Sequence, residues 1–68
     1  MKVVVNGEEK EIPDELTVEG LLNLLNIGKE RVAVELNLDI VPKAKFAETA
    51  LKDGDKLEIV SFVGGGRC

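Results

Sequence analysis

The chain has 68 residues, the size of one small domain, and hydrophobic residues make up 44% of it. Its 13 acidic and 9 basic residues give a net charge of -4, which argues against nucleic acid as a partner because such binding neutralises phosphates with Lys and Arg. It has no His, and its only Cys is Cys68, so it lacks the commonest general base and the usual zinc ligands. A self-contained enzyme or a metal site is therefore not expected.

Nothing in the sequence indicates a membrane or secreted protein. No apolar stretch is long enough to cross a bilayer, and the beginning at Met1 lacks the pattern of a signal peptide. A single Cys cannot form a disulfide within the chain, which fits a reducing compartment. The expectation is a soluble cytoplasmic protein without a bound cofactor.

The first predicted element is a β-hairpin. The apolar run 2–5 is followed by Asn6-Gly7, a pair that tolerates the positive φ angles of a type I′ turn. The return strand is expected over about residues 8–12, which are highly charged. It should therefore be short and solvated on one face.

A helix is predicted over about residues 18–26. Thr17 can cap its N-terminus, and Gly28 is expected to provide a left-handed C-terminal cap. The apolar positions that share one helical face are Val18, Leu21, Leu22 and Leu25.

Two strands and an irregular segment are predicted next. Residues 32–36 alternate and are rich in β-branched side chains, which is typical of a strand, and residues 39–42 indicate a short strand that ends at Pro42. The type of structure over 43–51 is ambiguous, with Phe46 expected in the core beside a short helical turn.

The last predicted strand covers residues 56–63 and follows a turn at Asp53-Gly54-Asp55. The two carboxylates of this turn could suggest a metal loop, but too few ligands follow at calcium-loop spacing. The side chains expected on the core face of the strand are Leu57, Ile59 and Val63.

The order of these elements predicts an α+β domain. The first and last strands are the most hydrophobic, so they are expected in the middle of the sheet as parallel neighbours. One main helix across a mixed sheet of four or five strands is the β-grasp, or ubiquitin-like, architecture. Residues 1–63 would form this domain and residues 64–68 a flexible glycine tail.

The tail Gly64-Gly65-Gly66 indicates chemistry at the end of the polypeptide. Glycine has no side chain to bury and loses the most backbone entropy when ordered, so folding does not require it here. Three extended residues reach about 10 Å, far enough to enter a partner's narrow active site. Adenylation there would turn the carboxylate into a mixed anhydride that a sulfur or nitrogen nucleophile can attack. The alternative is an inert end or a linker.

Arg67 and Cys68 follow the glycines, so activation of Gly66 requires their removal. We expect cleavage after Gly66. Two alternatives remain open: the chain ends naturally at Cys68, whose exposed thiol reacts, or the two residues were added.

Val60 and Phe62 alternate with the core positions of the last strand and should lie on the opposite sheet face. No second helix is available to cover that face, so an exposed apolar patch beside the tail predicts a docking surface that continues into Val63 and Gly64. The alternative is that a loop from residues 38–50 folds over these side chains.

The chain resembles the ThiS family of sulfur carrier proteins over nearly its whole length. The similar segments, in order, are Val3-Val4-Val5-Asn6-Gly7, Leu21-Leu22 with Leu25, Val32-Ala33-Val34-Glu35-Leu36-Asn37, Ile40-Val41-Pro42, Leu51-Lys52-Asp53-Gly54-Asp55 and Ile59-Val60-Ser61-Phe62-Val63-Gly64-Gly65-Gly66. Their order, the chain length and the terminal glycines together make the resemblance specific.

This resemblance implies a protein cosubstrate, not an enzyme. Gly65 and Gly66 correspond to the family's closing Gly-Gly pair. An E1-like adenylyltransferase (ThiF) would use ATP and magnesium to adenylate Gly66. A persulfide from a cysteine desulfurase or sulfurtransferase would then displace AMP, and thiazole synthase (ThiG) would take sulfur from the resulting thiocarboxylate.

Three features depart from the family pattern. Leu38 stands where Gly is frequent, Phe46 stands where Trp or Tyr is usual, and Arg67-Cys68 extends past the normal end. Related carriers with such extensions are trimmed by a JAMM-type metalloprotease, and some serve cysteine or homocysteine pathways. The alternatives are those pathways, a molybdopterin carrier, a ubiquitin-like modifier and an interaction domain with an inert tail.

Overall fold

The computed structural model of the chain describes residues 1–61. The strands are β1 (Lys2–Val5), β2 (Glu8–Glu11), β3 (Val32–Leu36), β4 (Asp39–Val41) and β5 (Lys56–Ser61), and the helices are α1 (Val18–Leu24) and the short 3₁₀ turns η1 (Lys29–Arg31) and η2 (Lys43–Lys45). The predicted elements are confirmed, with bounds that differ by one or two residues. The last two residues of the strand predicted over 56–63 lie outside the described part.

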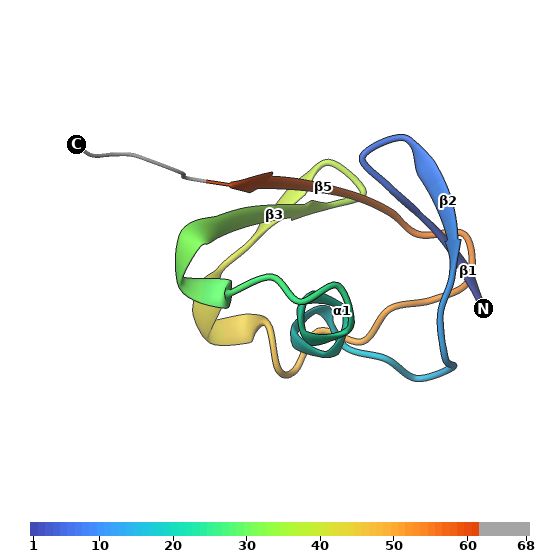
Figure 1. Cartoon of the computed structure of the whole chain (residues 1–68), viewed down its shortest axis with the longest axis horizontal. Coiled ribbons are helices and arrows are strands. Elements are labelled where there is room, and N and C mark those ends of the chain that lie inside the picture. Colours follow the sequence, from blue (N-terminus) through green and yellow to red (C-terminus); the bar gives the residue numbers. More distant parts are fainter. Residues whose placement is uncertain (62–68) are drawn as a thin grey trace.

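The five strands form one mixed sheet in the order β2-β1-β5-β3-β4. β1 and β5 are parallel neighbours, while the β1–β2, β3–β4 and β3–β5 pairs are antiparallel. The sheet curves over one side of α1, as Figure 1 shows. The β-grasp prediction, including the parallel pairing of the first and last strands, is confirmed.

The core lies between α1 and the concave face of the sheet. Alternation in the strands and the helical repeat in α1 bring apolar side chains together there, because each pattern places them on one face. The fully buried ones include Val3, Val18, Leu21, Leu22, Val34, Phe46 and Leu57. Phe46, at the end of η2, therefore has the core position that the sequence indicates.

The segment after β4 packs against the beginning of α1. The backbone N–H of Glu19 donates to the carbonyl of Phe46 at 3.0 Å, and that of Val18 donates to the carbonyl of Thr49 at 2.9 Å. Thr17 and Ala50 form an isolated β-bridge. These contacts hold the ambiguous segment 43–51 on the helix side of the sheet.

The two ends of α1 differ in how well the sequence predicts them. The Thr17 hydroxyl accepts from the Gly20 N–H at 3.0 Å, so the N-cap is confirmed. The predicted cap at Gly28 is wrong: Gly28 has φ of −73° and precedes η1, while Asn26 takes the left-handed conformation with φ of 61°. Asn adopts this conformation more readily than other residues with a side chain, so the helix ends earlier than Gly28 suggests.

The turn between β3 and β4 keeps a left-handed geometry despite the absence of glycine. Asn37 and Leu38 have φ of 52° and 75°. Such a φ is rare for a bulky side chain, and Leu38 is also 89% exposed. The bulky Leu38 thus occupies a left-handed position in this turn and exposes its apolar side chain.

Asp55 is the one buried charged residue among residues 1–61, with 6% exposure. Its carboxylate accepts from the Lys52 N–H at 2.7 Å and from Asn37 Nδ2 at 3.1 Å, while Asn37 Oδ1 accepts from the Lys56 N–H at 3.0 Å. The predicted turn at 53–55 thus fixes the beginning of β5 against the β3–β4 turn. No three acidic side chains within 1–61 gather as metal ligands.

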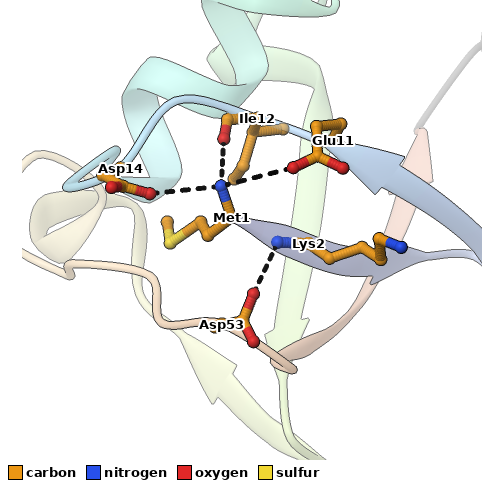
Figure 2. A network of polar contacts seen from close by, with 6 residues as sticks. All are labelled: Met1, Lys2, Glu11, Ile12, Asp14 and Asp53. Atoms are coloured by element: carbon orange, nitrogen blue, oxygen red, sulfur yellow. Dashed lines mark hydrogen bonds and ion pairs between the residues drawn. The ribbon is translucent and has the colours of Figure 1, made fainter.

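The terminal amine of Met1, just before β1, contacts the segment that follows β2 (Figure 2). It donates to the Ile12 carbonyl at 2.7 Å and to Asp14 Oδ1 at 3.1 Å, and Glu11 Oε2 lies 3.7 Å away. The Lys2 N–H donates to Asp53 Oδ1 at 2.7 Å. The hydrogen bond to Asp14, and then the negative charges of Asp14, Glu11 and Asp53, raise the pKa of the amine.

The free energy of unfolding should therefore fall at alkaline pH. Because the pKa of the Met1 amine is raised from its ordinary value near 8, its stabilising contribution is complete below about pH 8 and is lost as the pH rises through the higher folded pKa. Urea midpoints measured between about pH 7.5 and pH 10 should fall, and fall less steeply in Asp14→Asn. Equal slopes for the two proteins would contradict this role of the Met1–Asp14 contact.

Within residues 1–61, no helix is long and apolar enough to span a membrane.

Candidate functional site

The predicted site begins where β5 ends. β5 lies at the centre of the sheet, and its last residue, Ser61, directly precedes Phe62. The predicted site residues Phe62, Val63, Gly64, Gly65 and Gly66 lie outside the described residues. The structure therefore shows how the body holds the strand that leads to them.

β5 pairs with β3 over a longer stretch than with β1. Its pairing with β3 runs from Leu57 to Ser61, whereas its pairing with β1 covers only Lys56 and Leu57. At Ile59 the carboxamide of Asn6 makes two hydrogen bonds to the backbone of β5. Sequence reasoning assigned Asn6 to the hairpin turn and missed this contact, because the partner is 53 residues away.

The outer face of the sheet carries an exposed apolar patch, which we define as Val60, Ile40 and Leu38. Val60 is 55% exposed and lies opposite Ala33 in the β3–β5 register, so its predicted outward position is confirmed. The alternative of a covering loop from residues 38–50 is wrong for Val60, because Val60 is exposed. Residues 39–41 of that segment form the edge strand β4, and Phe46 and Thr49 bond to the beginning of α1. Ile40 and Leu38 are 70% and 89% exposed.

Sequence reasoning missed Ile40 and Leu38 as part of this surface. For Ile40 a signal existed, because it alternates with Val41, which is buried on the core face of β4 beside Val34 of β3. Leu38 carries no such pattern, since its exposure follows from the turn geometry.

Two carboxylates interrupt the patch, because Glu35 lies between Ile40 of β4 and Glu58 of β5 in the register of the sheet. Glu35 and Glu58 are directly opposite in the antiparallel register of β3 and β5, on the same face as Val60. Like charges in this arrangement destabilise a sheet, and neither side chain forms an ion pair with another residue of 1–61. A partner surface that is apolar with a basic side chain would complement this face.

A groove of about 530 Å³ lies on the helix side of the sheet, next to Ser61. Its apolar lining comes from Val5, Leu25, Ile27, Val32 and Ile59. Asn6 and Ser61 lie at this groove too, so the end of β5 is bordered by a hollow on one face and the apolar patch on the other.

Comparison with known proteins gives a consistent result. The model of the ThiS family matches residues 3–66. The chain is 56% identical over 66 residues to a thiazole synthase of Paramagnetospirillum magneticum, an alignment that covers 97% of this chain and 20% of that protein. It is 40% identical over 63 residues to the sulfur carrier protein ThiS of Bacillus subtilis, covering 91% of this chain and 96% of that protein.

Solved structures agree with the sequence comparison. The crystal structure of thiamine biosynthesis protein ThiS from Geobacter metallireducens superposes with a TM-score of 0.83 at 38% identity, covering 97% of this chain and all of that one. Together with the mixed five-stranded sheet over one helix, these matches show that the chain belongs to the ThiS family.

Proposed function

We propose that the C-terminal glycine of this chain, Gly66, is the group that carries sulfur. Membership of the ThiS family identifies the chain as a sulfur carrier protein of thiamine biosynthesis. The observation that carries the finer proposal is the extent of the family match, which runs through Gly65 to Gly66 and leaves out Arg67 and Cys68. The chain itself is a cosubstrate on which other proteins act.

The chemistry takes place at the carboxylate of Gly66. One carboxylate oxygen attacks the α-phosphorus of ATP on a ThiF-like adenylyltransferase, pyrophosphate leaves, and an acyl-adenylate forms with magnesium as the partner enzyme's ion. The terminal sulfur of a persulfide, supplied by a cysteine desulfurase or sulfurtransferase, then attacks the acyl carbon and AMP leaves. Reductive cleavage of the resulting acyl disulfide by a thiol gives the thiocarboxylate, whose sulfur goes to the thiazole of thiamine.

The enzyme that accepts the sulfur is a thiazole synthase. Two proteins named thiazole synthase contain a region that is 56% and 39% identical to this chain, and the chain spans only about a fifth of their length. A region similar to the carrier within the same polypeptide supports a reaction in which the two act together.

Removal of Arg67 and Cys68 precedes activation, because only a free carboxylate at Gly66 can be adenylated. A JAMM-type metalloprotease suits this cleavage. Intact mass spectrometry of the protein isolated from its own cells tests the proposal: it should show loss of both residues and replacement of one oxygen by sulfur. A population that retains Arg67-Cys68 while thiamine is being made would contradict it.

The apolar patch is proposed to dock on the adenylating enzyme, and the contact continues from Val60 into Phe62, Val63 and Gly64. Val60→Asp should raise the Kd of the carrier for that enzyme about tenfold or more, because it introduces a charge into an apolar contact beside Glu35 and Glu58. Calorimetric titration measures this change.

Leu24→Asp is the matched control, since Leu24 and Val60 are both 55% exposed but Leu24 lies on α1. Its Kd should equal that of the unsubstituted chain. An equal loss of affinity in both variants, or in neither, would exclude the outer sheet face as the docking surface.

A further inference from the structure

The pairing of β5 changes abruptly just before the residues that carry the proposed chemistry. Within residues 1–61, β1 lies opposite β5 only at Lys56 and Leu57, and the chain then turns away at Asn6-Gly7. From Glu58 onward β5 has a neighbouring strand on the β3 side alone. A strand paired on one side leaves backbone groups on the other side without a ladder.

The side chain of Asn6 continues the β1–β5 ladder by one step. Its Oδ1 accepts from the Ile59 N–H at 2.7 Å, and its Nδ2 donates to the Ile59 carbonyl at 3.1 Å. The Asn6 backbone N–H donates to the Leu57 carbonyl at 2.9 Å. A carboxamide offers a carbonyl and an N–H side by side, as a peptide unit does, so it can replace a strand residue here.

This contact requires Asn specifically. Asn6 has φ of 51°, a conformation that Asn, Asp and Gly adopt at low cost. Asp has no N–H to donate to the Ile59 carbonyl, and Gly has no side chain to make either bond. The turn alone would accept any of the three, whereas the two bonds to Ile59 are made only by Asn.

We propose that Asn6 is a positioning residue for the activation of Gly66. The proposal rests on the proposed function, because Gly66 is the reacting residue. Gly66 is seven residues beyond Ile59, and an extended chain of that length spans about 24 Å. With the carboxamide in place, β5 is held on both sides up to Ile59; without it, two-sided support ends at Leu57. On binding, the adenylating enzyme would then have to fix the conformation of a longer stretch of chain. The entropy lost in doing so would weaken its affinity for the carrier.

Asn37 supplies a matched control. It also has a positive φ, 52°, and its carboxamide also makes two hydrogen bonds, to the Asp55 carboxylate and the Lys56 N–H. These bonds hold the beginning of β5, whereas Ser61 is the last residue of that strand. Asn37→Gly therefore removes a comparable anchor without changing the support at Ile59.

The test compares Asn6→Gly, Asn6→Asp and Asn37→Gly in the mature chain ending at Gly66. Steady-state pyrophosphate release by the adenylating enzyme gives KM and kcat for each. Asn6→Gly should raise KM about tenfold, the value of one or two hydrogen bonds, with kcat unchanged. Asn6→Asp keeps the hydrogen-bond acceptor, so its KM should lie between those of the unsubstituted chain and Asn6→Gly. Asn37→Gly should keep the KM of the unsubstituted chain.

Amide hydrogen exchange by NMR provides a readout that does not depend on the partner. The Ile59 amide should exchange at least about tenfold faster in Asn6→Gly, and at its original rate in Asn37→Gly. An unchanged KM or an unchanged Ile59 rate in Asn6→Gly, or an equal rise of KM in Asn37→Gly, overturns the positioning role alone. Absence of pyrophosphate release from the unsubstituted chain overturns the proposed function and this role together.

Discussion

Ending the chain at Gly64 in place of Gly66 should reduce adenylation by at least about 100-fold. Each extended residue spans about 3.5 Å, so removal of Gly65 and Gly66 withdraws the carboxylate by about 7 Å from the position that a docked carrier must reach. Misplacement of a reacting atom by even 1 Å can cost about 100-fold in rate. The measurement is the rate of ATP-dependent acyl-adenylate formation by the partner enzyme, at saturating ATP.

The matched control is the chain that ends at Gly66, examined for the same rate and for its thermal unfolding. Both forms should unfold at the same temperature, because both contain the core side chains and strands that the structure describes within residues 1–61. A chain ending at Gly64 that is adenylated at the rate of the longer form would show that the length of the glycine end is irrelevant.

Phe46→Ala should remove a large share of the stability of the domain. Phe46 is 2% exposed and is among the fully buried side chains between α1 and the sheet. Truncation of a buried Phe costs about 3–5 kcal/mol through lost transfer energy and the cavity left behind. A domain of this size has a total stability of about 3–10 kcal/mol, so the variant should be partly or wholly unfolded near 37 °C.

Urea unfolding followed by far-UV circular dichroism measures this loss. Leu24→Ala provides the control for deletion of an exposed apolar side chain, since Leu24 is 55% exposed, and its midpoint should change little. A midpoint for Phe46→Ala close to that of Leu24→Ala would contradict the core position of Phe46.

The layers of the fold could be predicted because their patterns are local. Val32 and Val34 alternate with less buried positions, and the leucines of α1 recur at helical spacing, so each element's buried face follows from its own sequence. The hydrophobicity of the first and last strands then places them in the middle of the sheet. The end of α1 was less predictable, since Asn26 and Gly28 can both adopt a left-handed conformation and only the packing of the following segment decides between them.

The candidate site could be predicted only in part. The outward position of Val60 can be predicted from alternation along one strand. The apolar patch depends also on the order of the strands, because only the pairing of β4 with β3 brings Ile40 to the same sheet as Val60. The role of Asn6 needs contact across 53 residues and could not be read from the hairpin motif. Side-chain hydrogen bonds between distant segments depend on the completed fold, and no local pattern encodes them.

Formation of an acyl-adenylate on the chain ending at Gly66 is the most direct test of the account. Purified carrier, its adenylating enzyme, ATP and magnesium should yield a carrier whose intact mass has increased by one adenylate, with fragmentation placing the addition on the terminal glycine. The same mixture with the chain ending at Cys68 should give no addition at Gly66. Absence of the adduct from the shorter chain, or its attachment to any other residue, would contradict the claim that the glycyl carboxylate is the reacting group.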